Sequence, residues 1–265
     1  MSKPLIAVDL DGTLIDGQGH YSLATRDYFR DLSAQGCIIV LASGRPFRAM
    51  KHIYEDLRLT GPSICYNGQL VFNPNDPSFH PVEKRFKAED IRRVYNELKP
   101  CVEVFMAESA NTIYITDEDA RLSHFFPSEG MNIVKGDFTD TLNEDVYTCL
   151  FKSFDTSDKP FLNAIEGLEG VAWRSWSNAT YSELYFPACD KGIALASLVA
   201  QLGIDRDDIY AFGDAVNDVS MLELAGHPFG MKNSKVPELL SRFPVTKNPV
   251  EEDGVMMTLR ELLNR

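Results

Sequence analysis

The chain of 265 residues carries 26 Lys and Arg against 39 Asp and Glu, which gives a formal net charge of −13. A hydrophobic fraction of 44% and a charged fraction of 25% are ordinary for a globular protein, and they exclude collagen-like, low-complexity and wholly disordered chains. The length predicts one large α/β domain, or a core domain that carries a smaller inserted one. Because an acidic chain repels phosphate backbones and anionic lipids, we expect no nucleic-acid partner and no membrane partner.

Cysteine and histidine residues are few and scattered. The five cysteines contain no C-x-x-C pair and the five histidines contain no H-x-H or H-x-x-x-H pair. The sequence therefore predicts neither a disulfide framework nor a zinc site. The longest apolar runs are far shorter than the roughly 20 residues that span a bilayer, and the N-terminus does not resemble a signal sequence. We expect a soluble cytoplasmic protein with reduced thiols.

The first part of the chain predicts buried strands that alternate with helices. Residues 5–8 are continuously apolar and end in Asp9, which is typical of a strand buried on both faces of a parallel sheet. A helix follows that Ser22 caps and Gly36 ends. The further elements expected here are a strand at 37–42, a helix from Pro46 to about 57, and hairpin arms at 63–66 and 69–72 around Asn67-Gly68.

The last part of the chain repeats this alternation. Its expected elements are a helix at 192–202 that Gly203 ends, a strand at 209–212, a helix at about 218–225, a short segment at 228–231, and helices near 235–242 and 254–263. Such an order is typical of a doubly wound parallel sheet, a Rossmann-like α/β fold. We therefore expect residues 1–84 and 188–265 to form one core domain.

The middle of the chain, residues 85–187, has a different pattern. Several strands with few helices predict an antiparallel sheet that carries its helices on one face, an inserted α+β domain. Pro81 and Pro187 stand near the two crossings between the domains. The insert holds 10 Lys and Arg against 18 Asp and Glu, a net charge of −8, and so most of the net negative charge of the chain. Its expected elements are helices at 89–98 and 117–126, and strands at 102–106, 112–115, 147–154, 171–175 and 181–186.

Small and acidic residues follow three of the predicted core strands. Asp9 and Asp11 come after the first strand, Ser43-Gly44 after the second, and Asp214 and Asp218 after a late one. In an open α/β sheet, ligands bind outside the carboxyl ends of the strands. We therefore expect these residues to converge on one site, although they are far apart in the sequence.

The acidic residues of this group indicate a metal site. Asp9 and Asp11 stand two residues apart, and Gly12 lets the chain turn at once and bring both toward one centre. Together with Asp214 they form a cluster of like charges that is unfavourable without a cation. Carboxylate oxygens without His or Cys nearby favour Mg²⁺ over zinc. Taken alone, a D-x-D pair is more often a solvated turn at a strand end.

The other pieces of the pattern indicate an anion site. Ser43-Gly44 offers a hydroxyl and an unobstructed backbone N–H ahead of a helix, although Ser-Gly is also a common loop. Lys191 opens a helix, where the positive end of the helix dipole disfavours a cation. A bound anion would offset this unfavourable interaction. The alternative is a solvated surface lysine. Gly213 to Asp218 places an acid, an amide and an acid within one helical turn, although a plain capped helix explains either acid singly.

These motifs together resemble those of the haloacid dehalogenase (HAD) superfamily in order and spacing. The residues that carry the resemblance are Asp9-Leu10-Asp11-Gly12-Thr13, Ser43-Gly44-Arg45, Asp190-Lys191-Gly192 and Gly213-Asp214-Ala215-Val216-Asn217-Asp218. The resemblance covers essentially the whole chain. The insert between the second and third motifs is similar to that of the Cof-type, or HAD-IIB, sugar-phosphatase branch with its C2B cap.

This resemblance implies a Mg²⁺-dependent phosphatase that works through an aspartyl-phosphate. Asp9 is then the nucleophile, and Asp11 protonates the leaving oxygen and later activates water. Mg²⁺ is held by Asp9, by the backbone carbonyl of Asp11 and by Asp214. The residues implied at the phosphate oxygens are Ser43, Lys191, Asn217 and the backbone amides of Leu10 and Gly44, with Asp218 and Arg45 behind them.

The resemblance also implies that residues 85–187 form a cap that closes over the site as a lid and selects the leaving group. Arg174 and Glu183, on its last strands, are candidates for contact with the substrate. An acidic lid favours one phosphate on a neutral, hydroxyl-rich body. We therefore expect a small phosphorylated metabolite as substrate, a sugar monophosphate, and a monomer or weak homodimer.

Two other functions are compatible with the same motifs. A phosphomutase of the superfamily would transfer phosphate and would need a bisphosphate activator. A non-catalytic sensor of phosphorylated ligands could use the same fold, since fold alone does not prove function. Loss of Asp9 or Asp11 would be typical of such a sensor, and both residues are present.

Overall fold

The computed structural model describes residues 3–154, 159–176 and 180–263. Within it the chain forms two compact units, one of Met1–Val82 with Asp190–Arg265 and one of Glu83–Cys189. The junctions between the units thus fall at 82/83 and 189/190. They lie within two residues of the junctions expected from the sequence, 84/85 and 187/188. No helix in the described part of the chain is both long and apolar enough to cross a bilayer.

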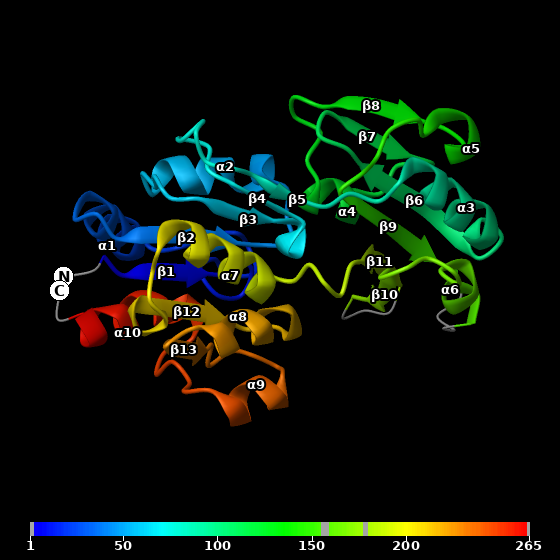
Figure 1. The fold of residues 1–265 in the computed structure, drawn as a ribbon. Helices are drawn as coiled ribbons and strands as arrows, with labels where there is room; N and C mark the ends of the chain where they lie inside the picture. Colours follow the sequence, from blue (N-terminus) through cyan, green and yellow to red (C-terminus); the bar gives the residue numbers. More distant parts are fainter. Residues whose placement is uncertain (1–2, 155–158, 177–179, 264–265) are drawn as a thin grey trace. The chain divides into compact units, whose positions relative to one another are not determined.

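The first unit is built around a seven-stranded sheet in the order β13-β12-β1-β2-β3-β4-β5 (Figure 1). Neighbouring strands from β13 to β3 pair in parallel, whereas β4 runs antiparallel to β3. The inner strand β1 pairs with β2 on one side and β12 on the other. The strands are β1 (Leu5–Val8), β2 (Ile38–Ala42), β3 (Ser63–Cys65), β4 (Leu70–Phe72), β5 (Val82–Glu83), β12 (Ile209–Gly213) and β13 (His227–Gly230).

Helices cover both faces of this sheet. Leu5 and Ala7 of β1 pack in one cluster with Leu195, whereas Ile6 and Val8 point to the opposite face and are fully buried there as well. The predicted doubly wound α/β core is therefore confirmed. Its helices are α1 (Leu23–Ala34), α2 (Phe47–Asp56), α7 (Lys191–Leu202), α8 (Val219–Leu224), α9 (Pro237–Arg242) and α10 (Gly254–Leu263), with single 3₁₀ turns at η1 (Tyr66–Gly68), η2 (Arg206–Asp208), η3 (Val216–Asp218) and η4 (Val250–Glu252).

The helix ends follow the capping residues in the sequence. The Ser22 hydroxyl accepts a hydrogen bond from the Thr25 amide at 3.0 Å, and Gly36 after the helix has a φ of 85°. The Asp190 carboxylate likewise accepts from the Ile193 amide at 2.7 Å, and Gly203 ends α7 with a φ of 65°. The predicted helix ends at Ser22, Gly36 and Gly203 are confirmed, whereas the Asp190 cap was not predicted.

The hairpin of β3 and β4 is present, but the expected two-residue turn at Asn67-Gly68 is wrong. Cys65 pairs with Leu70, so four residues connect the strands, and both Tyr66 and Asn67 have positive φ. Gly68 lies so close to the Asp190 carbonyl that a Cβ would stand 2.4 Å from its oxygen. The turn is therefore shaped by contact with the start of α7 rather than by strand twist alone.

The second unit contains a six-stranded sheet in the order β10-β11-β9-β6-β7-β8. All neighbours are antiparallel except β7 and β8, which pair in parallel. The strands are β6 (Val102–Glu108), β7 (Thr112–Ile115), β8 (Asn132–Lys135), β9 (Thr148–Ser153), β10 (Ala172–Ser175) and β11 (Tyr181–Tyr185), and the helices are α3 (Ala88–Leu98), α4 (Ala120–Phe125), α5 (Phe138–Thr141) and α6 (Lys159–Ala164).

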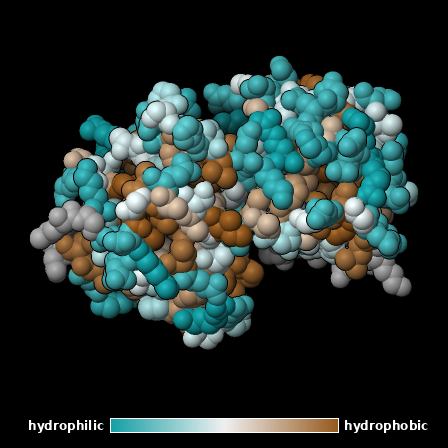
Figure 2. Space-filling view, in the orientation of Figure 1, coloured by the Kyte–Doolittle hydropathy of each residue, from teal (hydrophilic) through white to brown (hydrophobic). Residues whose placement is uncertain are grey.

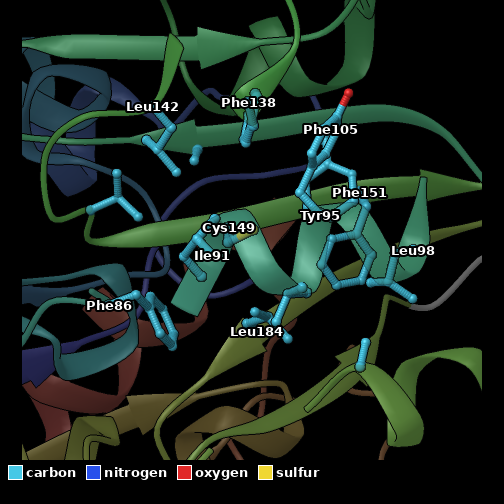
Figure 3. Packing of buried hydrophobic residues seen from close by; sticks show 14 of the residues in the cluster. Phe86, Ile91, Tyr95, Leu98, Phe105, Phe138, Leu142, Cys149, Phe151 and Leu184 are labelled. Atoms are coloured by element: carbon cyan, nitrogen blue, oxygen red, sulfur yellow. The ribbon is translucent and has the colours of Figure 1, made fainter. Parts of the chain in front are cut away.

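The core of this unit lies between one face of the sheet and three helices. Phe105 and Phe151 from the strands pack with Tyr95 of α3 and Phe138 of α5 (Figure 3). Phe151 also stacks on Phe161 of α6. This confirms the predicted α+β insert. Over the β7–β8 edge the surface is mostly hydrophilic (Figure 2).

Several details of the second unit differ from the sequence-based expectation. The expected purely antiparallel sheet is wrong, because β8 adds a parallel edge strand that carries no alternating pattern; Ile133 is 58% exposed. The expected helix at 117–126 begins only at Ala120, since the Asp119 carboxylate caps it by accepting from the Arg121 and Leu122 amides. Helices α5 and α6 are too short to give a periodic signal.

Candidate active site

A buried lysine joins two of the predicted acids. Lys191 is the first residue of α7, and its side chain is completely buried. Its Nζ donates to Asp9 Oδ1 at 2.5 Å and to Asp218 Oδ1 at 2.6 Å. Asp9 follows β1 directly, and Asp218 ends the turn after β12. The carboxyl ends of the two strands therefore converge, as the strand-end argument predicts.

The second oxygen of Asp218 fixes the backbone of its own turn. Asp218 Oδ2 accepts from the amides of Asp214 at 3.0 Å and Ala215 at 2.9 Å. Gly213 permits this close packing, because a Cβ there would stand 2.3 Å from the Cβ of Asp218. Asp218 thus holds both Lys191 and the loop that carries Asp214.

Three carboxylates share this small space. Asp9, Asp214 and Asp218 each offer an oxygen within 4.8 Å of the others. Burial, helped by the charges of Asp218 and Asp214, raises the pKa of Asp9 well above its ordinary value, although Lys191 opposes the shift. Burial and Asp218 raise the pKa of Asp214 to about 6. Burial alone would lower the pKa of Lys191, but Asp218 and Asp9 outweigh it and the pKa is raised.

This donor set fits Mg²⁺. Among the described residues, the three crowded carboxylates have only the single positive charge of Lys191 to balance them, and the pKa values of Asp9 and Asp214 are raised. Hard oxygen ligands of this kind are those that Mg²⁺ prefers. Gly12 lets the loop after β1 approach Asp214: its φ is 83°, and a Cβ would stand 2.5 Å from Asp214 Oδ2. Thr13 adds a hydroxyl 3.4 Å from Asp214 Oδ1.

Asp11 is held apart from the three crowded carboxylates. Arg45 binds it with two hydrogen bonds, from Nε to Oδ2 at 2.9 Å and from Nη2 to Oδ1 at 2.5 Å. The Asp11 side chain is 44% exposed, whereas that of Arg45 is 11% exposed. Asp11 is therefore oriented by a bidentate ion pair at the more open side of the site.

Three of the predicted phosphate-binding residues lie around Asn67. The Asn67 amide donates to the Ser43 carbonyl at 3.0 Å, and Asn67 Oδ1 accepts from Asn217 Nδ2 at 2.8 Å. A Cβ on Gly44 would stand 3.0 Å from Asn67 Nδ2. Ser43 is almost fully buried, and its Oγ accepts from the Arg45 amide at 3.1 Å. The loops after β2, β3 and β12 therefore meet at this point.

Comparison with known proteins identifies the family of the chain. A family model described as haloacid dehalogenase-like hydrolase matches residues 6–259. The chain belongs to this family. The 5-amino-6-(5-phospho-D-ribitylamino)uracil phosphatase YitU of Bacillus subtilis is 31% identical to this hydrolase over 98% of each chain.

Solved structures show the same fold. A haloacid dehalogenase-like hydrolase from Bacteroides thetaiotaomicron superposes on this hydrolase with a TM-score of 0.83 at 24% identity, over 98% of this chain and 100% of that one. A HAD subclass IIB sugar phosphatase superposes with a TM-score of 0.77 at 16% identity, over 98% and 99%. The predicted superfamily and the predicted phosphatase class are confirmed by these matches.

The two residues predicted to contact substrate from the second unit of the hydrolase bind each other. Arg174 and Glu183 face one another across β10 and β11, with Arg174 Nε 2.5 Å from Glu183 Oε1. The guanidinium also lies over the Tyr185 ring at 4.7 Å. A contact between either residue and substrate stays a prediction.

Sequence reasoning missed several residues of this site. Asn67 carries only a turn signal in the sequence, and Thr13 stands out only as part of the Asp9–Thr13 motif. Asn233 and Ser234, in the loop after β13, hydrogen-bond to backbone carbonyls of the acidic loops. Their one sequence signal is a polar Asn-Ser pair shortly after the short segment expected at 228–231.

Proposed function

We propose that this hydrolase is a Mg²⁺-dependent phosphatase that releases phosphate from a small phosphorylated metabolite through an aspartyl-phosphate on Asp9. The observation that carries the proposal is the fully buried Lys191, bound to both Asp9 and Asp218 beside a third crowded acid, Asp214. Such a cluster is costly for folding and is typical of a site that binds a cation and an anion together.

Asp9, Asp214 and the backbone carbonyl of Asp11 are the proposed metal ligands. When bound, Mg²⁺ would supply positive charge that lets an anionic nucleophile and an anionic phosphate approach each other. The three carboxylates share one lysine, so a second positive charge balances the group better than Lys191 alone.

The remaining roles concern the residues of the chain itself. An oxygen of Asp9 attacks phosphorus while the bond to the leaving oxygen breaks, and Asp11 gives that oxygen a proton. Asp11 then takes a proton from the water that attacks the aspartyl-phosphate, which releases phosphate and restores Asp9. Because Arg45 occupies both oxygens of Asp11, this ion pair must loosen for the proton to move.

The proposed phosphate-binding groups surround Asp9 with hydrogen-bond donors. The Lys191 ammonium has three N–H donors. Among the described residues, Asp9 and Asp218 are the acceptors within its reach. The third N–H is therefore the proposed donor to a phosphate oxygen. The other proposed donors are Ser43, Asn217 and the backbone amides of Leu10 and Gly44.

The second unit is the proposed substrate-selecting lid. Residues 85–187 carry a net charge of −8, which disfavours polyanions. The relative YitU is named for a ribityl monophosphate, which places one phosphate on a hydroxyl-rich body. That compound and the sugar monophosphates are therefore the proposed substrates. The proposed location of the enzyme is the cytoplasm, and its proposed oligomeric state is a monomer or weak homodimer.

A phosphate-release screen tests this proposal. The panel holds hexose, pentose, nucleotide and pyridoxal phosphates and 5-amino-6-(5-phospho-D-ribitylamino)uracil, each with Mg²⁺ and with EDTA. We expect release without any acceptor, and a monophosphate as the best substrate. Asp9→Asn should abolish turnover, whereas Asp27→Asn, a change on exposed α1, should not. Activity in Asp9→Asn would refute the mechanism, and turnover that needs a bisphosphate would favour a mutase.

A further inference from the structure

The loop after β13 contacts the backbone of the Asp9–Thr13 loop. Asn233 Nδ2 donates to the Gly12 carbonyl at 2.7 Å, and Asn233 Oδ1 accepts from the Val250 amide at 3.0 Å. Both ends of the carboxamide are used in this way. Asn233 therefore ties the carbonyl that follows Asp11 to the start of η4.

The neighbouring side chain binds the second acidic loop. Ser234 is 6% exposed, and its Oγ donates to the Asp214 carbonyl at 2.5 Å while it accepts from the Val236 amide at 3.1 Å. The Met231 amide adds a bond to the Gly213 carbonyl at 2.9 Å. Two consecutive side chains thus hold one carbonyl from each of the two loops that carry acids.

The segment that carries these side chains is itself firmly anchored. The Lys232 amide donates to Thr246 Oγ1 at 3.1 Å. The Gly230 amide donates to the Pro244 carbonyl at 2.8 Å, and the Gly230 carbonyl accepts from the Thr246 amide at 2.9 Å. Residues 230–234 can therefore act as a rigid support.

A support of this kind is needed because the two acidic loops repel each other. Gly12 lies against the carboxylate of Asp214 with no room for a side chain, and Asp9 and Asp214 offer oxygens within 4.8 Å. Like charges at this distance push the loops apart. Mg²⁺ requires near-ideal octahedral geometry, so a small separation of the loops would weaken its binding.

We propose that Asn233 and Ser234 are positioning residues, which hold the Asp9–Thr13 loop and the Asp214 loop together so that both acids bind one cation. The catalytic consequence rests on the proposed function, whereas the effect on the loops rests on these hydrogen bonds alone. Neither residue touches the reacting atoms. They act on Asp9 and Asp214 through the backbone.

Metal binding without substrate tests the proposal. The readout is the rise in the thermal unfolding midpoint as Mg²⁺ is titrated into wild type, Asn233→Ala, Ser234→Ala and Ser234→Thr. We expect each alanine variant to weaken the apparent Mg²⁺ affinity about 10- to 100-fold, as loss of outer hydrogen bonds to metal sites does. Ser234→Thr keeps the hydroxyl and should restore most of the affinity.

The matched control is Asn248→Ala. The Asn248 carboxamide binds Glu252 Oε2 at 3.0 Å in the same part of the chain. This variant should leave the Mg²⁺ affinity unchanged. Hydrogen exchange provides a second readout: amides of residues 10–16 and 213–218 should exchange faster in Asn233→Ala than in wild type, and Mg²⁺ should slow them in wild type.

The outcomes separate this proposal from the proposed function. If both alanine variants bind Mg²⁺ as wild type does and only lose stability, the positioning role is wrong although the phosphatase stands. If wild type releases phosphate from no substrate while the variants still differ in Mg²⁺ affinity, the proposed function is wrong and the positioning role stands. If the alanine variants do not fold, Ser234→Thr and the exchange of the wild-type loops decide the question.

Discussion

The two units of the molecule pair acids with cations in opposite ways. In the first, Asp9 and Asp214 share Lys191 with a further acid, and burial raises the pKa of both. In the second, Asp137 has Lys99 as its own partner on the surface, and a hydrogen bond from that ammonium lowers the pKa of Asp137. An acid beside a lysine can therefore have a raised or a lowered pKa. The direction depends on how deeply the acid is buried and on how many other acids lie close to it.

This difference separates binding sites from ordinary surface. Exposed ion pairs contribute little to stability and respond weakly to change. Crowded, buried acids reduce stability, and a fold retains them where a ligand offsets the repulsion. Four experiments test the contrast, and the largest effect is expected where the charges are most deeply buried.

Lys191→Met should have the largest effect. It leaves Asp9 and Asp218 as buried charges without their cation, which costs about 3–5 kcal/mol of unfolding free energy. Loss of a positive charge aimed at the transition state should also lower kcat by about 10²- to 10³-fold. Chemical denaturation and phosphate release measure the two effects.

A second variant separates stability from activity at this position. Lys191→Met combined with Asp218→Asn removes one of the two uncompensated charges, so part of the stability should return while activity stays low. Turnover at the wild-type level in Lys191→Met would show that the buried lysine of the first unit matters no more for activity than an exposed ion pair of the second.

Gly12→Ala should have the next largest effect. Its Cβ would stand 2.5 Å from Asp214 Oδ2 at a φ of 83°, so the loop after β1 must move away from Asp214. Displacement of catalytic groups by about 1 Å costs about 10²-fold in rate. Gly19→Ala is the matched control, because Gly19 has a φ of 84° and nothing within 4 Å of the added Cβ. Equal loss of activity in both variants would mean that backbone strain alone is responsible.

The response to pH should distinguish the crowded acids. Since the pKa of Asp214 is raised from 3.8 to about 6, the folded metal-free protein binds this proton more tightly than the unfolded chain. The contribution of Asp214 to unfolding free energy therefore falls as pH rises from about 4 to 6. Mg²⁺ competes with the proton, so its stabilising effect should grow over the same interval.

Melting curves with and without Mg²⁺ between pH 5 and 8 measure this dependence. The Mg²⁺-induced rise in midpoint should be largest above pH 7 and should shrink below pH 6, and Asp214→Asn should remove most of it. An equal rise at pH 5 and pH 8 would contradict the raised pKa.

The ion pair of the second unit should give the smallest effect. Arg174 and Glu183 are 32% and 11% exposed and bind each other, so a double-mutant cycle with Arg174→Gln and Glu183→Gln should give a coupling of about 0.2–1 kcal/mol. If the pair also contacts substrate, KM will rise in the single variants while kcat stays constant. Unchanged KM would assign the pair to sheet structure alone.

The sequence was informative where local rules act. Continuous apolar runs indicate the buried parallel strands, and Ser22 and Gly203 indicate helix ends that capping alone explains. The acids after β1 and β12 were recognisable because they follow buried strands, and parallel strands bring their carboxyl ends to one edge.

The sequence was uninformative where distant residues decide the outcome. Nothing local indicates that Asn233 binds the Gly12 carbonyl, or that Asn67 joins Asn217 to the Ser43 loop, since these contacts depend on tertiary packing. Edge strand β8 was missed for a related reason: an exposed strand needs no alternating pattern to pair with β7.

The position of β1 in the first sheet has a consequence for how the protein is made. Its two neighbours are β2, which follows soon after it, and β12, which lies near the other end of the chain. During synthesis, β1 therefore presents an open edge until residues 209–213 leave the ribosome. The whole second unit is complete by then and can fold first. Asp9 meets Lys191 and Asp218 only at the end of this sequence, so a ribosome-bound or truncated chain that lacks β12 would hold a folded second unit and no assembled acidic site.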